Sequence, residues 1–90
     1  MLSFLPKNTI DIMQELRAKF KKRRKCLGYT QQELSTRSGV SLGSLKRFET
    51  SGQISLESLL KLALVLECLG DFERVGEPKE VVPKSIEELL

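Results

Sequence analysis

Two adjacent cationic residues, Lys46 and Arg47, lie in a short segment that also carries the hydroxyl groups of Ser41 and Ser44. An arginine guanidinium donates two parallel hydrogen bonds to a carboxylate, a phosphate or the edge of a guanine base. A lysine ammonium instead binds phosphate as a point charge. This combination suits the binding of an anionic partner better than the breaking of covalent bonds.

Residues for catalysis or metal binding are few. The chain has no histidine, and its two cysteines, Cys26 and Cys68, are too few for the usual zinc sites. It has no glycine-rich phosphate loop, and Glu87 and Glu88 lie near the C-terminus rather than in an evident pocket. We therefore expect a protein that is not an enzyme and that binds no cofactor and no metal ion. Each cysteine lies near the end of a helical apolar pattern, so we expect buried free thiols in a cytoplasmic protein.

Membrane association is not expected either. The N-terminal sequence MLSFLPKN has too short an apolar run for a signal peptide. The longest apolar region, residues 54–69, is interrupted by Glu57, Lys61 and Glu67 and is too short to span a bilayer.

Charge is distributed unevenly along the chain. Residues 1–50 contain eleven Lys/Arg and four Asp/Glu, for a net charge of +7, whereas residues 51–90 contain four and eight, for a net charge of −4. Six of the seven residues in the run KFKKRRK, Lys19 to Lys25, are basic. A basic half of this kind fits a polyanion-binding surface, and it fits a solvated basic helix face equally well.

The elements that must position these residues are helices, because no stretch of any length alternates between apolar and polar residues as a strand would. We predict an all-α fold of five helices, with an arm over residues 1–8, a helical domain over residues 9–75 and a tail over residues 76–90. The signals for helix starts are caps at Asn8 or Thr9, Thr30, Ser41 and Ser55, with a further capping box at Ser85 and Glu88 in the tail. Glycines give the helix ends or the loop after them: Gly28, Gly39, Gly52 and Gly70. A short fifth helix is expected over residues 71–75.

Apolar spacing predicts which faces are buried. In the first helix, one face is expected to contain Ile10, Met13, Leu16, Phe20 and Leu27. The second helix is too short to be stable alone and must be held by packing. Four apolar residues are spaced to fold the second and third helices onto one another across a turn at Gly39: Leu34, Val40, Leu45 and Phe48. This geometry is a helix-turn-helix, and it leaves the outer face of the third helix free to enter a DNA major groove.

The run TQQELSTRSGVSLGSLKRFE, Thr30 to Glu49, preceded by RRKCLGY, resembles the lambda-repressor-like (XRE-type) helix-turn-helix family. The leucine-rich ISLESLLKLALVL is similar to the fourth helix of that family, and the resemblance covers roughly residues 10–75. It implies a five-helix domain that binds operator DNA, generally as a homodimer. By position it implies that Gln31 contacts a DNA phosphate and that Arg24 and Glu49 form a structural ion pair. The complete predicted DNA-binding set is Gln31, Gln32, Ser41, Leu42, Gly43, Ser44, Lys46 and Arg47.

Some of these residues depart from the family pattern or allow a second interpretation. Leu42 and Gly43 cannot read a base by side-chain hydrogen bonds; Leu42 suits a thymine methyl group and Gly43 a close approach of helix and groove. Alternatively, the two form an apolar patch for another protein. Gln31 is alternatively a solvated first-turn glutamine.

The leading hypothesis is a dimeric transcriptional repressor that reads a palindromic operator in double-stranded DNA. The alternative is an interaction module, such as an antitoxin, whose tail or fourth and fifth helices bind a partner protein such as a toxin. The tail motivates this alternative because Ile86, Leu89 and Leu90 form an apolar stripe too short to fold alone. A disordered tail is the competing interpretation.

Overall fold

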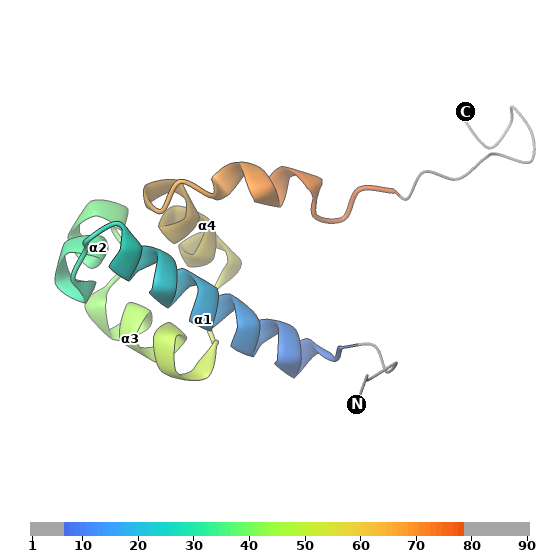
Figure 1. Cartoon of the computed structure of the whole chain (residues 1–90), viewed down its shortest axis with the longest axis horizontal. Helices are drawn as coiled ribbons and strands as arrows, with labels where there is room; N and C mark the ends of the chain where they lie inside the picture. Colours follow the sequence, from blue (N-terminus) through green and yellow to red (C-terminus); the bar gives the residue numbers. More distant parts are fainter. Residues whose placement is uncertain (1–6, 79–90) are drawn as a thin grey trace, which may run out of the picture.

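The computed structural model describes residues 7–78, and within this range the chain is helical and contains no β-strand (Figure 1). The elements are α1 (Thr9–Cys26), α2 (Gln31–Ser38), α3 (Leu42–Ser51), α4 (Leu56–Val65) and the 3₁₀-helix η1 (Leu69–Arg74). The predicted all-α class is thus confirmed. The predicted capping box at Ser85 and Glu88 lies outside the described residues.

Each α-helix begins at the cap that the sequence predicts. Asn8 Oδ1 accepts a hydrogen bond from the Asp11 amide at 2.8 Å, and Thr30 Oγ1 accepts one from the Glu33 amide at 3.0 Å. The hydroxyl groups of Ser41 and Ser55 accept in the same way at the starts of α3 and α4. These bonds use only neighbouring residues, which is why sequence alone locates them.

The core lies where α1 packs against α3, α2 packs against α3 and α4, and η1 packs against α4. Phe20 of α1 meets Phe48 of α3 edge to face, with ring centroids 5.6 Å apart. The four apolar residues predicted to join α2 and α3 are all buried: Leu34, Val40, Leu45 and Phe48. The remaining buried apolar residues are Leu59, Leu62, Ala63 and Leu66.

The predicted apolar face of the first helix is wrong at both ends. Phe20 is buried and both Met13 and Leu16 are half-buried, whereas Ile10 is 59% exposed and Leu27 is 39% exposed. Leu27 lies beyond the helix as its C-cap. At the N-terminal end the reason is length: the 18 residues of α1 span about 27 Å, whereas the 10 residues of α3 beneath it span about 15 Å. The first turns of α1 therefore project beyond the core (Figure 1).

The predicted end of the fourth helix at Gly70 is also wrong. The helix ends at Val65, and Glu67 adopts a left-handed conformation with φ of 63° although it is not a glycine. The Cys68 amide bonds to the carbonyl of Ala63 at 2.9 Å, which closes the last turn. The guanidinium of Arg23 donates to the carbonyls of Leu66 and Glu67, so a contact from α1 stabilises this early turn. Gly70 consequently lies inside η1, and the predicted helix over residues 71–75 is the 3₁₀-helix instead.

Candidate nucleic-acid interface

The turn between α2 and α3 is fixed by local bonds. Gly39 has φ of 79°, a conformation that glycine adopts without steric penalty, and its amide bonds to the Ser35 carbonyl at 3.0 Å. The Ser35 hydroxyl donates to the Val40 carbonyl at 2.6 Å, and the Val40 amide donates to Ser38 Oγ at 3.1 Å. With Val40 itself buried, the turn sets the angle at which α3 leaves α2.

The outer face of α3 is open to solvent. Gly43, Lys46 and Arg47 are exposed, and a Cβ atom built on Gly43 would meet no other atom within 4 Å. Neither Lys46 nor Arg47 forms a salt bridge with any carboxylate of residues 7–78. The inner face of the same helix is buried through Leu45, Phe48 and Glu49. The helix therefore presents two cationic side chains, neither of which is paired within the described range, on a face opposite its buried contacts with the core.

Other residues of the predicted set are more constrained. Ser41 is exposed and Ser44 is half-buried, and their hydroxyl groups bond to one another at 2.9 Å. Leu42 is half-buried beside them. Gln32 is exposed at the start of α2, where its amide donates to Thr36 Oγ1 at 3.4 Å. Ser41, Leu42 and Ser44 thus lie at the start of the helix that carries Lys46 and Arg47, whereas Gln32 lies on α2.

Behind this face lies a buried salt bridge. Arg24 of α1 donates from Nε to Glu49 Oε2 at 2.7 Å and from Nη2 to Glu49 Oε1 at 3.0 Å, and both side chains are at least nine-tenths buried. Arg24 Nη1 also donates to the Tyr29 carbonyl at 2.9 Å, so the pair joins α1, the α1–α2 loop and α3. Burial raises the pKa of Glu49, but hydrogen bonds from Arg24 and Gln31 outweigh burial and hold this pKa below its ordinary value.

Gln31 also belongs to this hydrogen-bond network. The sequence suggested a phosphate contact or a solvated side chain for Gln31, and neither interpretation included a bond to Glu49. The Nε2 atom of Gln31 donates to Glu49 Oε1 at 2.9 Å, so the half-buried side chain is oriented by the salt bridge. Nε2 has a second hydrogen to donate. A phosphate contact from that group or from the first amides of α2 remains a prediction.

The basic run of α1 is divided between structural and exposed residues. Arg24 holds Glu49 and Arg23 holds the end of α4, whereas the four lysines of the run are exposed. One turn or more earlier, Gln14 donates to the Ser51 carbonyl at 3.1 Å and Arg17 donates to the Glu49 carbonyl at 3.2 Å. Both contacts cap the C-terminus of α3. Sequence reasoning missed them, although Arg17 and Arg24 flank the buried Phe20 at spacings of three and four residues, which places all three on one helix face.

The two cysteines do not match the prediction fully. Both thiols are free, but Cys26 is exposed and Cys68 is only half-buried, so the expectation that both are buried was wrong. Burial raises the pKa of the Cys68 thiol.

Among the described residues, no cluster of carboxylates and thiols could hold a metal ion. In the same range, no helix combines the length and apolar character needed to cross a membrane.

Comparison with known proteins agrees with this geometry. A family model described as Helix-turn-helix matches residues 20–71, which is more than half of the 90-residue chain. The matched region runs from the middle of α1 into η1 and includes the salt bridge, the turn and the outer face of α3. No curated protein and no solved structure matches the chain.

Proposed function

Because the chain belongs to the XRE-type, lambda-repressor-like helix-turn-helix family and is a DNA-binding regulator, we propose that it is a dimeric repressor with α3 as its reading helix. The observation that carries this proposal is the asymmetry of α3. Its inner face is fixed by the core and the salt bridge, and its outer face carries Lys46 and Arg47 without partners among residues 7–78. An α-helix of this kind fits the major groove.

Each residue of the outer face has a proposed role. Arg47 donates two hydrogen bonds to a guanine, and Lys46 binds a backbone phosphate. Gly43, with open space around it, lets the helix approach the bases closely. Leu42 contacts a thymine methyl group, and Ser41 and Ser44 donate to phosphates or bases at the helix start.

The second DNA contact is at the start of α2. Gln31, held by Glu49, and Gln32 are proposed to bind the phosphate backbone together with the free amides of the first turn. These contacts would orient α3 without reading sequence.

A homodimer is supported by apolar residues on the surface of α4. Leu56 is 67% exposed and Leu64 is 63% exposed, and they lie two turns apart on this helix. A symmetric contact between two copies would cover them and would place the two α3 helices about 34 Å apart, one turn of DNA. We propose that the dimer acts in the cytoplasm on a palindromic site.

The same exposed leucines favour a second candidate function. They fit an antitoxin-type module in which α4 contacts a partner protein, such as a toxin, while α3 contacts the operator shared by the two genes. Sedimentation of the purified chain separates the candidates. A dimer at micromolar concentration supports self-association, and a monomer that associates only when a co-purified protein is present supports the second candidate.

Selection of bound sequences from random duplex DNA tests the main proposal. We expect a palindrome whose half-sites lie about 10 base pairs apart. Recovery of no enriched sequence by the intact chain, or enrichment of a single unrepeated half-site, would contradict the dimeric reading.

A further inference from the structure

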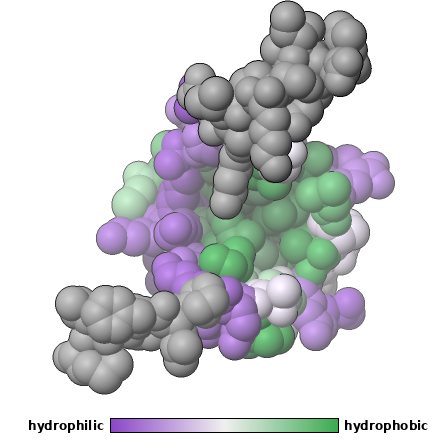
Figure 2. Space-filling view, turned by 90° about the vertical axis from the view of Figure 1, so that its right-hand side faces the viewer, coloured by the Kyte–Doolittle hydropathy of each residue, from purple (hydrophilic) through white to green (hydrophobic). Residues whose placement is uncertain are grey.

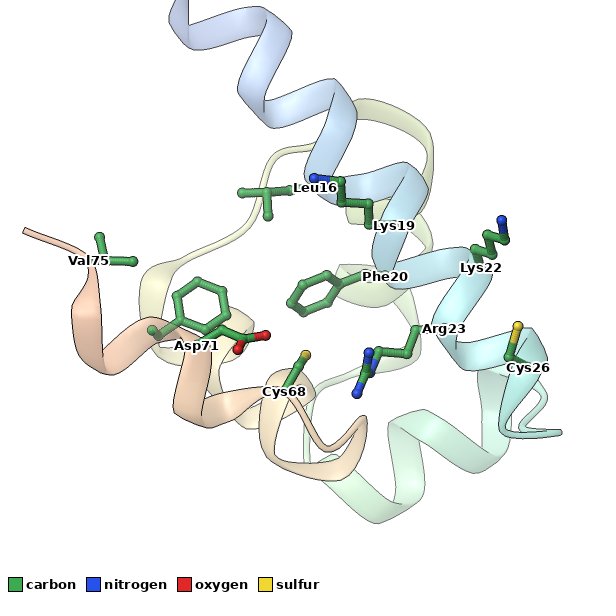
Figure 3. A pocket seen from close by; sticks show the side chains of 10 residues that line it. Leu16, Lys19, Phe20, Lys22, Arg23, Cys26, Cys68, Asp71 and Val75 are labelled. Atoms are coloured by element: carbon green, nitrogen blue, oxygen red, sulfur yellow. The ribbon is translucent and has the colours of Figure 1, made fainter.

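An open groove of about 580 Å³ lies between α1 and η1. Its apolar lining comes from Leu16 and Phe20 of α1 and from Phe72 and Val75 of the η1 region. Figure 3 shows Leu16 and Phe20 pointing from α1 toward η1, with the Cys68 thiol directed into the space near Phe20. Figure 2 shows apolar surface in the middle of one face, bordered by hydrophilic residues. The groove has the size of a ligand or peptide site, for which about 300–1,000 Å³ is usual.

The α1 side of the groove is positively charged. Lys19, Lys22 and Arg23 line it, against the single carboxylate of Asp71. Lys19 and Lys22 are exposed and form no salt bridge with another residue of the described range. An occupant should therefore combine apolar side chains with carboxylates.

The chain itself contains a segment of that composition. Residues 85–90, SIEELL, carry apolar residues at Ile86, Leu89 and Leu90, a spacing that places them on one face of a helical turn. The only charged side chains in the segment are the carboxylates of Glu87 and Glu88. Short amphipathic helices bind grooves through apolar residues at this spacing.

The connection is long enough for the segment to reach the groove of its own chain. Val75 lines the groove and Gly76 follows it in a turn, so the connection is the six residues from 79 to 84, which can span up to about 20 Å when extended. The groove runs along α1 from Leu16 to Cys26, about 15 Å. A tethered segment has an effective concentration on the order of 1 mM, well above the concentration of a second copy in a micromolar solution.

We propose that residues 85–90 dock in the groove between α1 and η1 of the same chain. The apolar residues of the segment cover Phe20 and Phe72, and its carboxylates pair with Lys19 and Lys22. This proposal goes beyond DNA binding and does not depend on it, and its test contains no DNA.

The reactivity of the Cys68 thiol reports whether the groove is occupied, because Cys68 lines the groove. In full-length protein with Cys26→Ser, the reaction of Cys68 with a thiol reagent is measured under native conditions, with the rate in urea as the reference. If the segment binds with a dissociation constant of about 0.1 mM, about ten of eleven molecules are closed. We therefore expect Ile86→Ser with Leu89→Ser to raise the native rate about tenfold. Val81→Ser with Val82→Ser is the matched control and should leave the rate unchanged.

The charged contact is tested with a second matched pair on α1. Lys19→Glu should raise the rate, whereas Lys21→Glu, on the same exposed helix but outside the groove lining, should not. A carboxylate placed near Cys68 would by itself disfavour the thiolate, so an increase in rate cannot be that direct effect.

Equal rates of Cys68 modification in the parent and in the Ile86→Ser, Leu89→Ser variant would overturn the proposal. In that case a partner protein is the remaining candidate for the groove. Protection that appears only as the protein concentration rises, together with a dimer that the tail substitutions abolish, would also overturn it. In that case the occupant is the segment of a second copy.

Discussion

Replacing Glu49 by Gln tests how α3 is held. The carboxylate of Glu49 accepts two hydrogen bonds from Arg24 and one from Gln31. The amide has one oxygen to accept these bonds, and its NH₂ group faces another donor. Arg24, which is 7% exposed, then keeps its charge with the Tyr29 carbonyl and at most one amide oxygen as acceptors. Removing one partner of a buried pair costs about 3–5 kcal/mol, and we expect the low end of that range, about 3 kcal/mol.

Urea unfolding followed by circular dichroism measures this loss directly. In a thermal scan, a change of about 3 kcal/mol corresponds to a fall in Tm of about 12–24 °C for a domain of this size. The double variant Arg24→Met, Glu49→Leu should recover most of the loss, because apolar residues of similar volume can replace a buried pair at little cost. The exposed pair of Glu57 and Lys61 supplies the control, and Glu57→Gln should leave the unfolding midpoint unchanged within error. If Glu49→Gln were no more destabilising than Glu57→Gln, the salt bridge would not hold α3 and the reasoning would be wrong.

Three further predictions concern glycine, pH and DNA. Gly52→Ala should lower the free energy of unfolding in urea by more than about 1 kcal/mol, because Gly52 has φ of 81° and the new Cβ would lie 3.0 Å from a backbone oxygen of α1. Gly43→Ala should instead raise it by up to about 1 kcal/mol, because Gly43 lies in a helix with open space around it. The lowered pKa of Glu49 stabilises the fold fully above the unfolded pKa of about 4.3, and this stabilisation is lost as pH falls through the folded pKa. Unfolding measured at decreasing pH should show this loss, and the loss should be smaller in Glu49→Gln. In DNA-binding assays, Arg47→Ala should relax specificity at one base position by about 1–3 kcal/mol, whereas Lys46→Ala should weaken binding to all sequences and lower the slope against log salt by about 1.

Features that depend on neighbouring residues could be predicted from the sequence. The caps at Asn8, Thr30, Ser41 and Ser55 are each made within three residues, and the left-handed turn at Gly39 needs only the glycine and the packing around it. The exposure of Lys46 and Arg47 follows from the helical spacing, because Leu45 and Phe48 define the buried side of the same helix and both cations lie outside it. In these cases the periodicity of the helix is sufficient.

Several features that sequence reasoning missed depend on polar contacts between distant residues. Arg23 lies 43 and 44 residues before the carbonyls that it binds, and Gln14 lies 37 residues before its partner. A cationic run indicates charge but not which guanidinium groups have backbone acceptors within reach. The end of α4 was misplaced for this reason, since Glu67 adopts a left-handed conformation where Arg23 binds its carbonyl.

These contacts explain why the outer face of α3 remains available for binding. Gln14 and Arg17 bind carbonyls at the end of α3, and Arg24 binds its one buried carboxylate, so three polar side chains of α1 fix this helix from behind. Glu49, the carboxylate of α3, is buried and bound by Arg24, and neither Lys46 nor Arg47 forms a salt bridge within residues 7–78. A helix held only by apolar packing could slide by fractions of a turn and spread its cations over several positions. The polar contacts of α1 restrict α3 to one register, which is the property that a sequence-reading helix requires.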